Sequence, residues 1–156
     1  MNSSDRRRPL ALLDANVVVL AFREGLNLAS EVGRLAPGAQ LAVPASVLRE
    51  LETLESRSVA GARPAREWAQ RLPVVPTTGH GDEAIVALAR TTGAIVITAD
   101  RALRDRLSEL GLRVLEPRDR VRLTAHRRRA GAATVKNRPR LAHGRRPVRG
   151  AHARRR

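Results

Sequence analysis

Short apolar runs alternate with amphipathic helical patterns along most of this 156-residue chain, and this alternation constrains the fold more than any other feature. The apolar runs predict strands near 10–14, 40–43, 73–76, 94–98 and 112–116. Helical patterns separate them near 16–24, 27–36, 45–57, 60–71, 82–92 and 101–110. Strands separated by helices indicate βαβ units with right-handed crossovers. We therefore expect an α/β fold, a doubly wound parallel sheet with helices on both faces.

Composition supports a buried sheet. The aromatic residues are Phe22 and Trp68, so Val, Ile, Leu and Ala must fill the core, as is typical of parallel sheets covered by helices. The length suits one domain and a tail. Since the chain has no Cys, a disulfide framework and a thiolate zinc site are excluded.

The net charge of +15 is unevenly distributed. Residues 1–118 contain 16 Lys and Arg against 14 Asp and Glu, whereas residues 119–156 contain 14 against a single Asp. Apolar periodicity also ends after Pro117, and a segment that buries little apolar surface cannot offset the entropy of ordering. We expect a folded domain over 8–118 and a disordered, Arg-rich basic tail over 119–156. As an alternative, Val121 and Leu123 could extend the domain by a few residues.

The basic tail is expected to bind RNA by charge rather than by sequence, since it has no aromatic side chains for stacking on bases. Arginine suits bidentate phosphate contacts. The alternative, a passive solubilising extension, stays open. The residues expected to contact RNA are Arg127, Arg128, Arg129, Lys136, Arg138, Arg140, Arg145, Arg146, Arg149, Arg154, Arg155 and Arg156.

Membrane and secretory classes are not supported. No apolar stretch approaches the roughly 20 residues that a membrane span requires. The apolar run 10–13 is interrupted at once by Asp14, so it does not resemble a signal peptide. Cytoplasmic location and no membrane partner are the expectations.

Four carboxylates fall where an open parallel sheet delivers side chains to one crevice: Asp14, Glu50, Asp82 and Asp100. Two of them follow predicted strands, and the other two lie near the starts of predicted helices. Carboxyl ends of strands and amino ends of the following helices meet at one edge of such a sheet, where ligands bind. Each like-charged pair there would repel by about 3 kcal/mol at 5 Å and an effective dielectric of 20.

Hard divalent cations remove such repulsion, and Mg²⁺ or Mn²⁺ held by carboxylates supports phosphodiester cleavage. The sequence therefore predicts a metal-dependent nuclease. Asn16 and Thr98 are expected to support the site, Asn16 by a hydrogen bond to Asp14. As alternatives, Asp14 and Asp100 could be ordinary helix caps, and Glu50 an ordinary solvated residue. Asp105 is excluded because it lies opposite the buried face of its helix.

Other catalytic templates fail. The chain lacks a Gly-x-Gly-x-x-Gly motif and a Gly-Lys-Ser/Thr loop, which argues against dinucleotide and P-loop sites. Its only lysine, Lys136, lies in the tail, so a receiver domain is not supported. His80 stands beside Asp82, where a solvated loop residue is favoured over a proton-transfer role.

Four strings, in order along the chain, resemble the motifs of PIN domains: Leu13-Asp14-Ala15-Asn16-Val17, the segment 44–54 with Glu50, the segment 81–89 with Asp82, and Ile97-Thr98-Ala99-Asp100. The resemblance covers about 10–116. Ala15 replaces a common Thr and Ala99 a common Asn, and neither change removes a carboxylate.

The resemblance implies an endoribonuclease that uses Mg²⁺ or Mn²⁺, with Asp14, Glu50, Asp82 and Asp100 as catalytic and metal-binding residues. Processing of ribosomal or other structured RNA is the expected role, and homodimers are frequent in such families. Two alternatives stay open. One is a toxin ribonuclease with an antitoxin partner, and the other is an inactive RNA-binding ribosome assembly factor.

Overall fold

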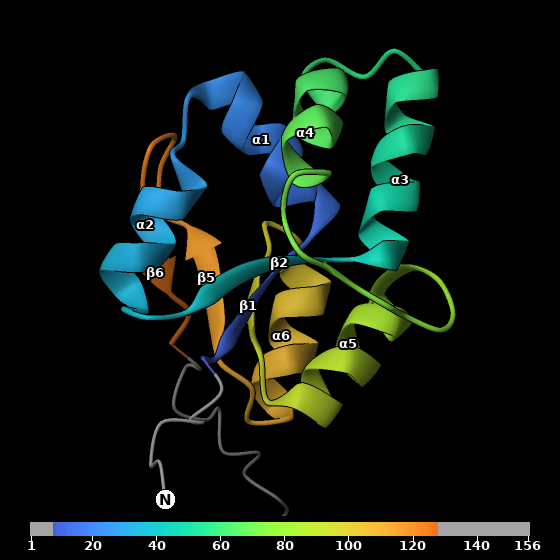
Figure 1. Ribbon diagram of the computed structural model, residues 1–156. Helices are drawn as coiled ribbons and strands as arrows, with labels where there is room; N and C mark the ends of the chain where they lie inside the picture. The colour runs from blue at the N-terminus through green and yellow to red at the C-terminus, as the bar shows by residue number, and fades with distance from the viewer. Residues whose placement is uncertain (1–7, 128–156) are drawn as a thin grey trace, which may run out of the picture.

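A six-stranded sheet forms the centre of the computed structural model, which describes residues 8–127 (Figure 1). The order is β3-β2-β1-β4-β5-β6, and every neighbouring pair is parallel except β5–β6. The strands are β1 Leu10–Leu13, β2 Gln40–Pro44, β3 Val74–Val75, β4 Ile95–Ile97, β5 Val114–Pro117 and β6 Leu123–Ala125.

Six helices connect the strands: α1 Ala15–Glu24, α2 Leu28–Leu35, α3 Ala45–Ser56, α4 Ala62–Ala69, α5 Gly81–Thr92 and α6 Arg101–Glu109. Each predicted helix and each of the five predicted strands is present, with ends shifted by at most a few residues. The α/β fold is thus confirmed. Across residues 8–127, none of these helices combines the length and apolar character that a membrane crossing demands.

The strand order explains where the helices lie. From β1 the chain moves outward to β2 and β3, then returns to β4 on the other side of β1 and continues to β5. Right-handed crossovers in opposite directions place helices on opposite faces. Figure 1 shows α1, α3 and α4 on one side of the sheet, with α5 and α6 on the other. The direction of winding therefore reverses between β1 and β4.

Small aliphatic side chains build the core, as the composition predicted. The central strand β1 is covered on both faces, and Ala11, Leu12 and Leu13 are fully buried. Neighbouring strands contribute Val43 and Val96, also fully buried. A continuous apolar run such as β1 is what a parallel strand needs between two helical layers.

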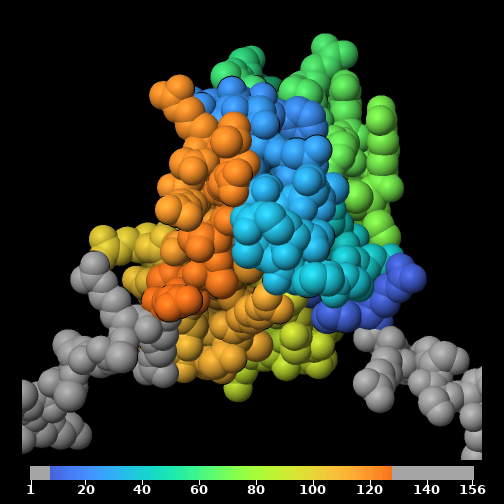
Figure 2. Space-filling view, turned by 90° about the vertical axis from the view of Figure 1, so that its left-hand side faces the viewer, coloured from blue at the N-terminus to red at the C-terminus, as the bar shows by residue number. Residues whose placement is uncertain are grey.

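The sixth strand was not predicted from the sequence. It pairs antiparallel with β5, and it contributes one buried side chain, Leu123. The main chain of Leu123 is also tied to α2, because its carbonyl accepts from Arg34 at 2.9 Å and its N–H donates to Glu31 at 2.9 Å. Figure 2 shows α2 beside this hairpin. A strand of three residues with one buried side chain is too short to show the alternation of buried and exposed residues that predicts a strand. Because of β6, the sheet extends past the expected domain boundary at residue 118.

Candidate active site

The register of β1 and β4 brings Asp14 and Thr98 together. Leu13 pairs with Ile97, so the next residue of each strand lies at the same edge of the sheet. The Thr98 hydroxyl donates to Oδ2 of Asp14 at 2.7 Å, although the residues are 84 positions apart. Both are buried, with 3% of Asp14 and 0% of Thr98 exposed. Their position is the point where the winding reverses, which is the usual ligand crevice of an open α/β sheet.

Hydrogen bonds to the main chain fix two of the acids. Oδ1 of Asp14 accepts from the N–H of Ala15 at 2.8 Å, and Oδ1 of Asp100 accepts from the N–H of Leu103 at 2.8 Å. The Thr98 hydroxyl also accepts from the N–H of Asp100 at 3.0 Å, so one hydroxyl links both acids. The capping alternative is therefore true of both residues. A cap does not exclude a ligand role, since each carboxylate oxygen has two lone pairs.

Glu50 lies in the second turn of α3, and Asp82 lies in the first turn of α5. Glu50 is half-buried, whereas Asp82 is exposed. The loop before α5 is attached to α3, because Ser46 N–H donates to Thr77 Oγ1 at 3.0 Å and Arg49 donates to the Gly79 carbonyl at 3.3 Å. These two bonds hold both helix starts at the same edge as Asp14.

The pKa shifts indicate that the four carboxylates are electrostatic neighbours. Burial raises the pKa of Asp14 to about 6; the charges of Glu50 and Asp82 add to this, while hydrogen bonds from Thr98 and Ala15 oppose it. The pKa of Glu50 is raised by burial and then by Asp82 and Asp100. Although Asp82 is exposed as a residue, partial desolvation of its carboxylate and then the charge of Asp100 raise its pKa, which Arg106 partly lowers.

The donor chemistry at this edge fits a hard divalent cation, because every group is a carboxylate or hydroxyl oxygen. Among residues 8–127, however, no three Asp, Glu or His side chains stand close enough to enclose one ion. Like charges without a cation repel, which keeps mobile side chains apart. Asp14 and Asp100 are fixed by hydrogen bonds, so Glu50 and Asp82 are the side chains that would turn inward around an ion.

Three other residues that the sequence singled out lie outside this cluster. Asn16 is exposed in the first turn of α1, and the hydrogen bonds described for Asp14 come instead from Thr98 and Ala15. His80 is exposed immediately before α5. Asp105 is exposed on α6, as expected, where it lies 3.8 Å from Arg101.

Sequence reasoning missed Ser46. This residue is only 7% exposed, in the first turn of α3, and its hydroxyl has no hydrogen-bond partner in the described part of the chain. A single Ser two residues after Pro44 gives no signal in the sequence, because its main-chain N–H contacts Thr77, which lies 31 residues away.

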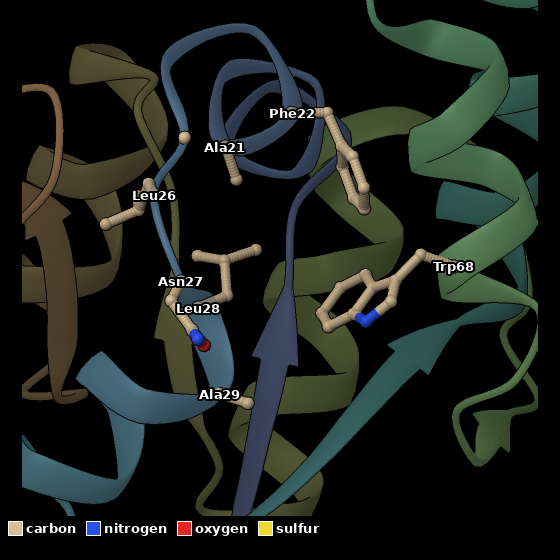
Figure 3. Close-up of a pocket in the computed structure, with 8 residues that line it drawn as sticks. Ala21, Phe22, Leu26, Asn27, Leu28, Ala29 and Trp68 are labelled. Atoms are coloured by element: carbon tan, nitrogen blue, oxygen red, sulfur yellow. The ribbon is translucent and has the colours of Figure 1, made fainter.

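An apolar hollow of about 410 Å³ lies away from the acids, between α1, the start of α2 and α4. It contains both aromatic residues of the chain (Figure 3), Phe22 and Trp68, edge to face with ring centroids 5.9 Å apart. Phe22 is 42% exposed. The lining includes no acid, histidine or arginine, so the hollow offers an apolar surface rather than catalytic chemistry.

A polar groove of about 870 Å³ is lined by residues of α6, β5 and β6 and by the two residues that follow β6. Its lining includes Arg101, the residue after Asp100, and then Arg104, His126 and Arg127. Glu116 within it accepts from Arg104 and lies 3.1 Å from Nδ1 of His126. Of the residues expected to contact RNA, Arg127 lies in this groove. Lys136 and the ten arginines from Arg128 to Arg156 fall outside the described residues.

Comparison with known proteins agrees with this geometry. Ribonuclease VapC9 of Archaeoglobus fulgidus is 33% identical over 110 residues, covering 67% of this chain and 79% of the relative. The solved structure of the PIN domain endonuclease Utp24 matches with a TM-score of 0.65 at 21% identity, covering 76% of this chain and 91% of that one. The sequence profile of the family described as "PIN like domain" matches residues 11–120. The chain therefore belongs to the PIN-like domain family.

Proposed function

We propose that this protein is a metal-dependent endoribonuclease in which Asp14, Glu50, Asp82 and Asp100 hold one or two Mg²⁺ or Mn²⁺ ions. The observation that carries the proposal is the buried Asp14 carboxylate, bonded to Thr98 where the sheet reverses its winding, with Glu50 and Asp82 near enough to raise its pKa. A divalent ion here would activate water and stabilise the leaving oxygen of a phosphodiester.

The side chains divide into a fixed and a mobile pair. Thr98 orients Asp14, and the first turn of α6 orients Asp100, so these carboxylates are preorganised. Glu50 and Asp82 adjust to the ion and the substrate. Asp14 must lose its proton to act as a ligand, and its raised pKa places that ionisation near pH 6.

The polar groove supports RNA as the substrate. Three arginines line it, Arg101, Arg104 and Arg127, together with three acids, Asp105, Glu109 and Glu116. Because Arg101 directly follows Asp100 in the chain, a strand at the acids would reach these arginines. Guanidinium groups suit phosphate contacts, and the sequence beyond residue 127 contains eleven further Lys and Arg. Because these contacts are made by charge, they favour structured RNA recognised by shape.

Processing of ribosomal or other structured RNA is the role that a long basic tail favours. The second candidate is a toxin ribonuclease, favoured by the 33% identity to Ribonuclease VapC9. A toxin needs an inhibiting partner encoded nearby, and its unopposed expression should arrest growth. An inactive RNA-binding assembly factor remains the alternative from another class, and it should bind RNA without cleaving it.

The test of the proposed function is cleavage of an end-labelled structured RNA by the purified protein. We expect internal cuts with Mn²⁺ or Mg²⁺, none with EDTA, and recovery when metal is returned in excess. Uncut RNA at every metal concentration, from protein that still binds the RNA, would favour the assembly factor.

RNA capture is tested by ending the chain after Arg127, which keeps β6. The truncation removes eleven basic residues, and each phosphate contact contributes about 0.7 to the salt slope for single strands. If half of them contact phosphate, the slope of log affinity against log salt should shrink by about four. EDTA in the assay separates binding from cleavage, and an unchanged slope would assign capture to the domain.

A further inference from the structure

Only three polar or charged residues are buried in the chain between residues 8 and 127: Asp14, Ser46 and Thr98. They follow three adjacent strands, since Asp14 comes after β1, Ser46 after β2 and Thr98 after β4. All three therefore lie at the carboxyl edge of the sheet. Asp14 and Thr98 are joined by a hydrogen bond, whereas the Ser46 hydroxyl has no partner among residues 8–127.

An unpartnered buried hydroxyl needs an explanation, because leaving a buried polar group unsatisfied costs about 1–3 kcal/mol. Helix capping does not provide one. The residue at the N-cap of α3 is Pro44, and this helix start has no side-chain cap hydrogen bond. The interaction of Ser46 with Thr77 uses the main-chain N–H and leaves the hydroxyl unused.

On the same face of α3, one turn further along, Glu50 carries a carboxylate that could accept from the hydroxyl. Residues four apart in a helix are neighbours on one face, and side chains lean towards the amino end, so an inward-turned Glu50 would lie within reach of Ser46. The charge of Glu50 also raises the pKa of Asp14, and Asp82 raises that of Glu50. The Ser46–Glu50 strip of α3 therefore adjoins the other acids.

We propose that Ser46 is a positioning residue whose hydroxyl donates to the Glu50 carboxylate when that carboxylate turns inward to a divalent cation. The arrangement would match the bond from Thr98 to Asp14 on the neighbouring strand. It explains two observations on residues 8–127: the Ser46 hydroxyl has no partner, and the carboxylates do not stand close enough to enclose an ion. The inference rests on the proposed function, because Glu50 turns inward only if this edge binds a cation.

The experiment measures Mn²⁺ binding by electron paramagnetic resonance of free Mn²⁺, together with thermal melting in EDTA. The full-length variants are Ser46→Ala, Ser46→Thr and the control Ser56→Ala. Ser56 lies at the other end of α3, where its exposed hydroxyl donates to the Thr53 carbonyl at 2.7 Å. Removing a group that orients a ligand typically weakens metal binding by tenfold or more.

We expect Ser46→Ala to weaken Mn²⁺ binding about tenfold while melting in EDTA at or above the wild-type temperature, since it removes an unsatisfied polar group. Ser46→Thr keeps the hydroxyl and should restore the affinity, and Ser56→Ala should bind Mn²⁺ normally.

Unchanged Mn²⁺ affinity in Ser46→Ala would overturn the inference. So would a lower melting temperature of Ser46→Ala in EDTA, which would make the hydroxyl a structural partner of the metal-free fold. Failure of Ser46→Thr to restore affinity while its melting in EDTA stays normal would also overturn it. Wild-type protein that binds no Mn²⁺, or binds it no better than Asp14→Asn does, would instead overturn the proposed function and this inference with it.

Discussion

Carboxylates at the edge of the sheet and carboxylates on the helix surfaces have opposite environments. On the surfaces, Glu31, Glu55 and Glu83 each accept from an arginine, and these hydrogen bonds lower their pKa values. At the edge, burial and neighbouring acids raise the pKa values of Asp14, Glu50 and Asp82. In residues 8–127, no arginine forms an ion pair with any of the four edge carboxylates.

This difference matters because the chain has 30 Lys and Arg against 15 Asp and Glu. The chain has twice as many cationic as anionic residues. A shortage of cationic side chains therefore does not explain why these acids form no ion pairs in the described part of the chain. Within residues 8–127, the edge acids are left without a cationic partner, which is the condition under which a bound cation would be stabilising. Surface pairs contribute little to stability, whereas crowded unpaired acids carry an energy that a bound cation can release.

The largest expected effect on activity comes from replacing a carboxylate at the sheet edge with a neutral amide. Asp14→Asn and Asp100→Asn should each lower metal-dependent RNA cleavage by more than about a hundredfold, since a ligand loss exceeds the loss of an orienting group. Both should stay folded, because the amide fits the same space. The assay is single-turnover cleavage with circular dichroism of each variant.

The matched control is Asp105→Asn, which alters an exposed carboxylate beside Arg101 and Arg104. It should cleave at nearly the wild-type rate. Equal losses in Asp105→Asn and Asp14→Asn would remove the distinction between edge and surface acids.

The second prediction concerns pH in EDTA. Because the folded-state pKa of Asp14 is raised from 3.8 to about 6, its protonated form stabilises the fold. That contribution is complete below pH 3.8 and is lost as pH rises through about 6. The loss is up to about 3 kcal/mol at 1.36 kcal/mol per pKa unit.

Denaturant titrations of wild type and Asp14→Asn between pH 4 and 7.5 measure this loss. The wild type should lose more stability than the variant over that range, since Asn does not titrate. Parallel pH profiles would mean that Asp14 ionises at its ordinary pKa, without a cost from burial.

A divalent ion should reverse that cost. At a Mn²⁺ concentration of 100 times its Kd, binding to the folded state alone adds about 2.7 kcal/mol. For a domain of this size the melting temperature should rise by roughly 10 °C. The rise should be larger at pH 7.5 than at pH 5, because protons compete with the ion for Asp14. Differential scanning fluorimetry in Mn²⁺ and EDTA measures it, and a melting temperature indifferent to Mn²⁺ at pH 7.5 would argue against a metal site.

The smallest effect is expected on the helix surface. Glu83→Gln removes the ion pair between α5 and Arg106 of α6, and both partners are solvated. Exposed pairs contribute little to stability, so the melting temperature in EDTA should stay close to that of the wild type. A large drop would show that the surface pairs, too, are important for the fold.

Much of this architecture could be predicted from the sequence because parallel strands and their connecting helices have strong periodic signals. The apolar run 10–13 and the acid that ends it sufficed to place Asp14 at the carboxyl edge. Strand β6 escaped prediction because a single buried residue, Leu123, carries no periodicity.

Details of the site depend on contacts between distant segments, which a single sequence does not reveal. Asn16 was expected to hold Asp14 because it is close in sequence, yet the bond comes from Thr98 on another strand. Thr98 was predicted to be a supporting residue, but the sequence did not predict that its hydroxyl would bond to Asp14. Ser46 gave no signal, because the contact of its main-chain N–H is with Thr77, in a loop 31 residues away.

The lengths of the outermost strands affect how copies of the protein can meet. In the part of the chain from residue 8 to 127, the sheet ends with the two residues of β3 on one side and the three residues of β6 on the other. Unpaired main-chain groups on a long edge strand invite another chain to add to the sheet, as happens in domain swapping and fibrils. Edges this short offer few such groups. We therefore expect any dimer of this protein to form through helix surfaces, so its sheet would end within each molecule.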